Sequence, residues 1–418
     1  MDGQAVPESV ASPLALIPHV LLSEAQPADR SVGEVVLDAL CAIRLYLDME
    51  VAFVAEFING RRQFRYVDSI LETIPIAVGD SDPLDESYCQ RVVDGRLPPI
   101  IPDAAALPAA QELPVTAALP VGAHLSVPIR LSNGQIYGTF CCFSTHPDPT
   151  LGARDLAIMQ LFADFTARQL CRDRAAEQAR REMTERVTAM LDAAAFTAVY
   201  QPIFHLAEQK IIGFEALTRF WLRPIRSPDI WFAEAAAVGL SEQLEMAAIA
   251  KAFTSLQQIP APLYLSINVS PQNILSGAIH RALSQVPLHR IVLEVTEHVA
   301  IPDYTSFADR LAPLRDRGLR LAVDDAGAGY ASFLHILKLN PDIIKLDIGL
   351  IRHIDTDHTR RALTAALVGF AQQTNAVIVA EGVETTAELQ TLQQLRVNKA
   401  QGYLLGHPLP IGETTALF

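Results

Sequence analysis

The sequence predicts an α+β domain followed by an α/β barrel of the (β/α)8 type. In the first third of the chain, Asn133-Gly134 separates two β-rich runs in "LSVPIRLSNGQIYGTFCCFS", which predicts a hairpin because this dipeptide accepts positive φ angles. From Val199 onward, about eight short apolar runs alternate with helix-length segments over roughly 220 residues, a number and spacing typical of a barrel.

Length and composition agree with this division. A chain of 418 residues, 50% of them hydrophobic, is too long for one ordinary domain. The net charge of −14 argues against a nucleic-acid polymer or an anionic membrane as the main partner, since both favour clustered Lys and Arg. The five cysteines show no metal-ligand spacing and indicate reduced thiols.

From the sequence we expect neither a secretory signal peptide nor a membrane span. The N-terminus begins acidic and contains prolines, whereas a signal peptide begins basic and continues apolar. The apolar region "ALCAIRLYLDMEVAFVAEF" is interrupted by Arg44, Asp48 and Glu50, so it does not predict a membrane span. We therefore expect a cytoplasmic protein without membrane insertion.

The first domain is expected to cover residues 31–171, after a loosely ordered Pro- and Ala-rich segment at 1–30. An apolar helical pattern at 31–47 leads into the strand candidate "VAFVAEF". The Pro-rich stretch "GRLPPIIPDAAALPAAQELP" is interpreted as a long loop before the hairpin. A second helical pattern at 151–171 completes a set of helices around a small antiparallel sheet.

A charged helix is expected to connect the two domains at 172–195. Glu177 and Arg181 are spaced i,i+4 in the favourable order, which stabilises an exposed helix. Two interpretations stay open: a solvated connector, or a helix that packs on its counterpart in a dimer and carries a signal. The dimer interpretation is supported by a narrow apolar stripe that consists of Met183, Val187, Met190 and Leu191.

The barrel is expected to cover residues 196–418. Runs such as "AVIVA" are apolar on both faces, as strands inside a ring of helices should be. The strand candidates are "VYQPIF", "IIGFEAL", "LYLSINVS", "RIVLEVTE", "LRLAVDD", "DIIKLD", "AVIVAEG" and "AQGYLL".

Acids and amides fall near the ends of these runs, and parallel barrel strands bring such ends to one rim. Each one alone is most often a helix cap or a turn residue. Together, in apolar surroundings, they would be strongly destabilising unless paired or bound to a cation. The polar residues in question are Glu215, Asn268, Glu294, Glu297, Asp324, Asp325, Lys345, Glu381 and Gln401.

The adjacent pair Asp324 and Asp325 favours a site for two cations. Oxygen ligands select hard ions such as Mg²⁺ or Mn²⁺, and no histidine pair has the spacing of a zinc site. Two such ions suit in-line attack of water on a phosphodiester. Asp324 and Asp325 are therefore interpreted as neighbouring carboxylates that two cations neutralise.

These residues, in this order, resemble the EAL domain, the family of cyclic di-GMP phosphodiesterases that produce linear pGpG. The naming motif stands here as Glu215-Ala216-Leu217, and the resemblance runs from about Val199 to the C-terminus. It implies that Glu215, Asn268, Glu294 and Asp324 bind one metal ion, and that Asp324, Asp325 and Glu381 bind a second.

The same resemblance implies roles in substrate binding and water activation. Lys345 would hold the attacking water with help from Glu381, and Glu297 would anchor the loop after Asp325, which couples the site to a homodimer interface. That loop departs from the usual family pattern, with Ala326 where Phe is common and Ala328 where Thr is frequent. The residues that would contact cyclic di-GMP are Gln201, Leu217, Arg219 and Gln401.

The N-terminal third resembles a GAF domain, on the hairpin "VPIRLSNGQIYGTFCCFS" and the helix "RDLAIMQLFADFTARQL". GAF domains bind small ligands or serve as dimerisation modules. Cys89 and His124 are the cofactor-attachment candidates, but packing or turn roles are favoured, so the GAF ligand stays unknown.

The sequence thus predicts a cyclic di-GMP phosphodiesterase that uses two Mg²⁺ or Mn²⁺ ions and is regulated by the GAF-like domain. The alternative within the family is a receptor that binds the dinucleotide and cleaves it weakly or not at all. An unrelated barrel enzyme of the enolase or aldolase type is less favoured, because Lys345 among many acids does not form a Schiff-base or carbonyl-binding set.

Overall fold

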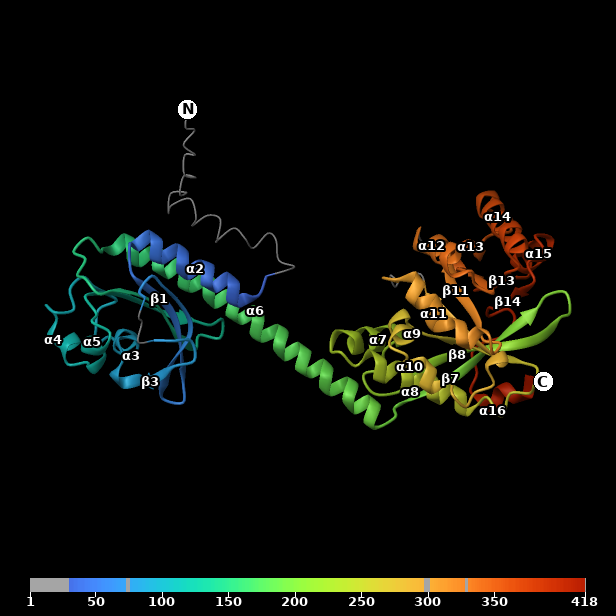
Figure 1. Cartoon of the computed structure of the whole chain (residues 1–418), viewed down its shortest axis with the longest axis horizontal. Helices are drawn as coiled ribbons and strands as arrows, with labels where there is room; N and C mark the ends of the chain where they lie inside the picture. The colour runs from blue at the N-terminus through green and yellow to red at the C-terminus, as the bar shows by residue number, and fades with distance from the viewer. Residues whose placement is uncertain (1–29, 73–75, 297–300, 328–329, 418) are drawn as a thin grey trace, which may run out of the picture. The chain divides into compact units, whose positions relative to one another are not determined.

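The computed structural model describes residues 30–72, 76–296, 301–327 and 330–417. The chain forms two compact units, with the boundary between Ala179 and Arg180, and each unit is described by itself (Figure 1). The N-terminal segment that was expected to be loosely ordered lies almost wholly outside the described residues. Among the described helices, none combines the length and the apolar character needed to cross a membrane.

The N-terminal unit is built on a six-stranded antiparallel sheet in the order β3-β2-β1-β6-β5-β4. The predicted hairpin is confirmed: β5 and β6 pair antiparallel, and Gly134 in the turn has a φ of 81°. The strands are β1 (Val51–Ile58), β2 (Arg61–Ser69), β3 (Ser81–Pro83), β4 (Ile100–Ile101), β5 (Ala123–Arg130) and β6 (Ile136–Ser144).

Helices cover both faces of this sheet. On one face, α2 (Val32–Leu47) and the first part of α6 (Ala153–Asp192) enclose an apolar core that includes Phe162. Ser31 and Glu34 form a capping box that fixes the start of α2. The other face carries α3 (Tyr88–Val93), α4 (Pro108–Gln111) and α5 (Pro114–Ala118), which pack in a second apolar core, and η2 (Leu84–Glu86) precedes α3.

Two differences from the sequence prediction have simple causes. The Pro-rich stretch contains β4, α4 and α5 as well as loop, because its prolines occupy the first turns of the two short helices, where no N–H is needed. The helix expected at 151–171 and the connecting helix expected at 172–195 form a single helix, α6, which ends at Asp192, since no Gly or Pro interrupts it. Near its end, Val187 and Met190 pack in the core of the second unit.

The second unit is a closed barrel with the strand order β10-β11-β12-β13-β14-β7-β8-β9, which confirms the predicted barrel. One feature differs from a fully parallel barrel, because β7 is antiparallel to both β8 and β14. The strands are β7 (Phe196–His205), β8 (Lys210–Phe220), β9 (Tyr264–Asn268), β10 (Ile291–Thr296), β11 (Arg320–Ala326), β12 (Ile343–Leu346), β13 (Val377–Ala380) and β14 (Lys399–Ala400).

The antiparallel strand follows from chain length. Residues 206–209 between β7 and β8 are too few for the helical crossover that parallel neighbours require, so the two strands form a hairpin. No helix separates them, which corrects the expected alternation at this point. The last strand is also shorter than the candidate "AQGYLL", and Gln401 lies just after β14.

Helices surround the barrel and bury one large core against the outer faces of its strands, with Leu265, Leu293 and Leu321 among its members. The helices are α7 (Pro228–Ala237), α8 (Ser241–Thr254), α9 (Pro271–Leu275), α10 (Ala278–Ala282), η3 (Leu288–Arg290), α11 (Tyr304–Arg315), α12 (Tyr330–Leu339), α13 (Ile348–Ile351), α14 (His358–Thr374), α15 (Thr386–Gln394), α16 (Ile411–Thr414) and η4 (Thr415–Leu417).

Candidate metal centre

Strand alternation explains how the polar residues meet. A separate apolar cluster is formed by alternate residues of the strands and fills the barrel interior: Ile203, Tyr264, Val292, Ala322, Ile343 and Val379. Side chains two residues apart on a strand point to the same face. Two residues beyond five of these positions stand Ser266, Glu294, Asp324, Lys345 and Glu381, which therefore form the next layer of the interior.

The ammonium group of Lys345 lies in the middle of this polar layer. Its Nζ is 2.7 Å from Glu381 Oε1 and 2.8 Å from Glu294 Oε2. Carboxylate oxygens of Glu215 and Asp324 each lie 3.3 Å away. Since Lys345 is 1% exposed, one buried cation is shared by four carboxylates.

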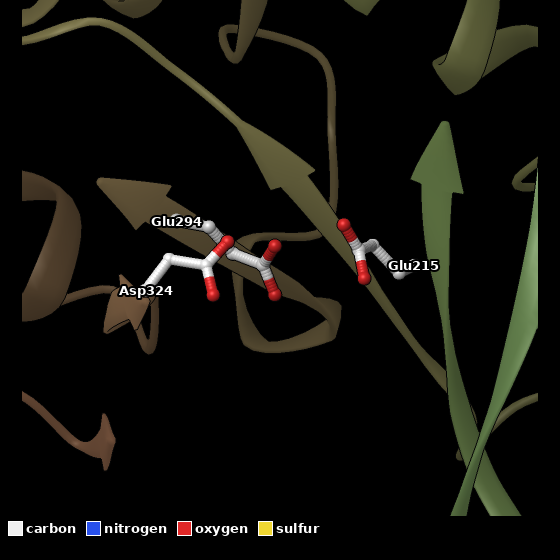
Figure 2. A group of neighbouring side chains, drawn as sticks. All are labelled: Glu215, Glu294 and Asp324. Atoms are coloured by element: carbon white, nitrogen blue, oxygen red, sulfur yellow. The ribbon is translucent and has the colours of Figure 1, made fainter. Parts of the chain in front are cut away.

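The carboxylates form two groups, each with ligand atoms that lie within 4.8 Å of one another, so that each group could hold a metal ion. Figure 2 shows the first group, in which Glu215, Glu294 and Asp324 extend toward one another from separate strands. The second group consists of Asp324, Asp325 and Glu381. Asp324 belongs to both, so the two candidate sites are neighbours that share one carboxylate.

A local break in the strand lets the adjacent aspartates act together. Neighbouring residues of a regular strand point to opposite faces. Asp325 instead has a φ of 54°, in the left-handed region, and the pairing of β11 with β12 is irregular between Val323 and Ala326. The N–H of Asp325 donates to Asp324 Oδ1 at 2.9 Å. This turn keeps the Asp325 carboxylate on the same side of the sheet as that of Asp324.

Neutral donors hold the carboxylates in place. Asn268 Nδ2 donates to Glu215 Oε1 at 3.2 Å, and Gln401 Nε2 donates to Glu215 Oε2 at 2.5 Å. Gln401 Nε2 also lies 3.3 Å from Gln201 Oε1, which places both glutamines beside the acidic groups. Ser266 Oγ donates a short hydrogen bond to Glu294 Oε1. Sequence reasoning missed Ser266, although its position two residues before Asn268 could have revealed it.

Burial and charge shift the ionisation of this cluster in opposite directions. Burial raises the pKa of Glu294 to about 8 and raises that of Glu381 well above its ordinary value, against the attraction of Lys345. Burial would also raise the pKa of Glu215, but Lys345, Gln401 and Asn268 together lower it. The carboxylates raise the pKa of Lys345, so it keeps its charge.

A cavity of about 760 Å³ lies between β7, β8, β9 and the helices α7 and α8, and it reaches Asn268, which donates to Glu215 of the first acidic group. Its lining includes Leu217, Arg219 and Asn268, two of which were predicted to bind substrate. Buried Glu245 also lines it and accepts from the Ser270 N–H at 2.8 Å, a contact that the sequence did not indicate. The cavity gives a ligand direct access to Asn268.

The remaining features of the barrel are the loop after Asp325 and two single residues, Ala326 and His407. Glu297 and Ala328 lie outside the described residues, so the expected loop anchor stays a prediction. Ala326 is buried at 1% exposure in the barrel core. His407 stacks on Tyr403 with ring centroids 4.4 Å apart.

Family models match both units. The EAL domain model matches residues 184–408, and the GAF domain model matches residues 32–170. The chain is 31% identical over 225 residues to the cyclic di-GMP phosphodiesterase NbdA of Pseudomonas aeruginosa, covering 51% of this chain and 29% of NbdA. It is 30% identical over 226 residues to the probable cyclic di-GMP phosphodiesterase PdeD of Escherichia coli, covering 52% of this chain and 42% of PdeD.

A solved phosphodiesterase structure also aligns with the barrel. The PaMucR phosphodiesterase, solved as a c-di-GMP complex, aligns with a TM-score of 0.51 and 28% identity over 56% of this chain and 99% of that chain. The curated relatives are longer proteins, and the chain spans less than half the length of each of the two named here. The chain belongs to the EAL domain family and carries a GAF domain ahead of its EAL domain.

Proposed function

We propose that the protein is a metal-dependent phosphodiesterase that hydrolyses cyclic di-GMP to linear pGpG. The observation that carries this proposal is the pair of acidic groups sharing Asp324, with Lys345 buried between them. The NbdA and PaMucR proteins, to which the chain is similar, are phosphodiesterases by name, and this likeness supports cyclic di-GMP as the substrate.

The donor set fits two Mg²⁺ or Mn²⁺ ions. All the ligand atoms of the two groups are carboxylate oxygens, which hard divalent cations prefer. The carboxylates of Glu215, Glu294, Asp324, Asp325 and Glu381, counted with the ammonium of Lys345, carry a formal charge of −4. Two divalent cations would neutralise it. Glu215, Glu294 and Asp324, with Asn268, would hold one ion, and Asp324, Asp325 and Glu381 the other.

The residues of the chain then have separate tasks. When bound, the ions supply Lewis-acid activation of the phosphodiester and of the attacking water. Lys345 donates a hydrogen bond to that water and orients it. Glu381, 2.7 Å from Lys345 Nζ, accepts the proton that the water loses. Lys345 also offsets negative charge that builds up on the phosphoryl oxygens.

The cavity would hold part of the dinucleotide beside this centre. Its volume of about 760 Å³ lies within the usual range for ligand sites. Arg219 would approach a phosphate from the cavity, and Leu217 would pack against the ligand. Gln201 and Gln401, buried near Glu215, would position the substrate from the other side.

We further propose that the GAF domain regulates the barrel in a cytoplasmic homodimer. The support is indirect: α6 contributes side chains to the cores of both units, which gives the two domains a shared element. Deleting residues 1 to about 170 is expected to change the turnover rate of the barrel. Unchanged kinetics after that deletion would contradict regulation by the GAF domain.

The experiment is an assay of the purified full chain with cyclic di-GMP and a panel of divalent cations. We expect Mg²⁺ or Mn²⁺ to be required for pGpG formation and Glu215→Ala to abolish it. The matched control is Glu208→Ala, because Glu208 lies in the turn of the same hairpin, is half exposed and pairs with Lys210. If the protein binds the dinucleotide but forms no pGpG, the enzyme hypothesis is wrong and the receptor hypothesis is supported.

A further inference from the structure

A polar cluster lies inside the GAF domain, on the sheet face covered by α3. Cys89 on α3 and Cys141 on β6 are both fully buried, with their sulfur atoms 3.6 Å apart. The two thiols come from segments 52 residues apart in the sequence. In the fold they face each other because alternate residues of β6 point toward α3.

A buried guanidinium accompanies the thiol pair. Arg62 is 2% exposed, and its Nη1 lies 3.4 Å from Cys89 Sγ. Its carbon Cζ stacks over the Phe64 ring at 4.7 Å, and its Nε donates to Asp82 Oδ1 at 2.9 Å. Asp82 is partly exposed, so this chain of contacts leads from the protein surface to a buried sulfur. The packing of an apolar core does not by itself require a buried guanidinium such as that of Arg62.

The surroundings make the two sulfur atoms unequal. Burial would raise the pKa of the Cys89 thiol, but the hydrogen bond with Cys141 and the charge of Arg62 lower it below the ordinary value. Burial raises the pKa of Cys141, whose sulfur lies 3.1 Å from Ser126 Oγ and 3.2 Å from Thr139 Oγ1. Cys89 thus has the character of an attacking thiolate and Cys141 that of a resolving thiol.

We propose that Cys89 and Cys141 form a redox-active dithiol that hydrogen peroxide oxidises to a disulfide within the GAF domain. This inference is independent of the proposed phosphodiesterase activity. A metal ion is not the favoured occupant, because the groups with metal-site geometry among the described residues are the two acidic ones in the barrel.

The chemistry proceeds in two balanced steps. The Cys89 thiolate attacks one peroxide oxygen, the O–O bond breaks, and the leaving hydroxide takes a proton to become water. Cys141 then loses its proton and attacks Cys89 Sγ, so that the S–S bond forms and the S–O bond breaks, releasing a second water. Two thiols and one peroxide give one disulfide and two waters.

The geometry permits the second step after a small movement. A disulfide brings its sulfur atoms to about 2 Å, so the pair must approach by roughly 1.6 Å from its present 3.6 Å. Cys89 lies on a six-residue helix, and the proposal requires a local opening of this short element. A water-sized oxidant can enter through the same opening.

The test begins with the reduced full chain, treated with hydrogen peroxide and then mapped by mass spectrometry of a non-reduced digest. We expect the intact chain to lose two hydrogens and the 89 and 141 peptides to be linked. This readout needs no variant. If the folded chain keeps these two thiols free in excess peroxide, or if the linkage joins other cysteines, the inference is overturned.

Variants sharpen the result, and circular dichroism checks that each one folds. Cys141→Ser should trap a sulfenic acid on Cys89 without forming the link. The matched control is Cys142→Ser, because Cys142 is equally buried but points to the opposite face of β6, next to Met159. We expect the control to keep the link, and a control that loses it would contradict the assignment. Arg62→Met should slow oxidation at neutral pH at least tenfold.

Discussion

Replacing Lys345 with Met tests whether the buried ammonium stabilises the four carboxylates around it. The substitution keeps the length and the apolar part of the side chain and removes the charge that lies within 3.3 Å of four carboxylates. Breaking a buried ion pair by removing one partner costs about 3–5 kcal/mol, because the remaining charges are left uncompensated.

We expect this loss to appear as a lower thermal midpoint of the barrel. For a unit of this size each kcal/mol corresponds to about 2–4 °C, so the midpoint should fall by about 6–20 °C in the presence of a chelator. Bound Mn²⁺ places positive charge next to the four carboxylates. Saturating Mn²⁺ should therefore remove at least half of the difference in thermal midpoint between the variant and the original chain. Differential scanning calorimetry with and without Mn²⁺ measures both values.

The control for this experiment is Lys399→Met. Lys399 also lies on a barrel strand, but its Nζ contacts the ring of Tyr264 at 5.3 Å, away from the acidic groups. Its replacement should change the midpoint by less, and by the same amount in chelator and in Mn²⁺. A Lys345→Met chain as stable as the original in chelator, or equally destabilised in Mn²⁺, would refute the reasoning.

Three further predictions concern single residues. Glu215→Ala should abolish turnover and leave the circular dichroism spectrum unchanged, and near-normal rates would defeat the ligand assignment. Ser266→Ala removes the donor to Glu294 and should weaken Mn²⁺ affinity about 10–100-fold in a titration, as losses of second-sphere hydrogen bonds do; an unchanged affinity would contradict this. Burial, with a smaller effect of the Arg62 charge, lowers the pKa of His124 to about 3, whereas the unfolded chain titrates near 6.5. The unfolded state therefore binds the extra proton as the pH falls through 6.5, and His124 should remove up to about 5 kcal/mol of stability by pH 3. Denaturant unfolding should show a weaker pH dependence for His124→Phe, and identical slopes would disprove the effect.

Much of the site could be predicted because its residues obey a simple spacing rule. In the sequence, Val292, Ala322, Ile343 and Val379 are each followed two positions later by a charged residue, and the same alternation places those charges inside the barrel. Apolar runs ending in acids were therefore sufficient to locate the carboxylates.

Other features depend on contacts that spacing does not encode. The interpretation of "IIKLD" gave Lys345 a role through the family resemblance, whereas its position among four carboxylates follows from the closure of the whole barrel. The left-handed turn at Asp325 breaks strand alternation, so no pattern of period two predicts it. The antiparallel β7 could have been predicted, since its connection to β8 is too short for a crossover.

Anomalous diffraction from crystals soaked in Mn²⁺ tests the two-cation centre most directly. We expect two peaks at the barrel rim, one among Glu215, Glu294 and Asp324, and one among Asp324, Asp325 and Glu381. A rim without bound manganese at saturating concentration, or a single ion away from Asp324, would contradict the proposed centre.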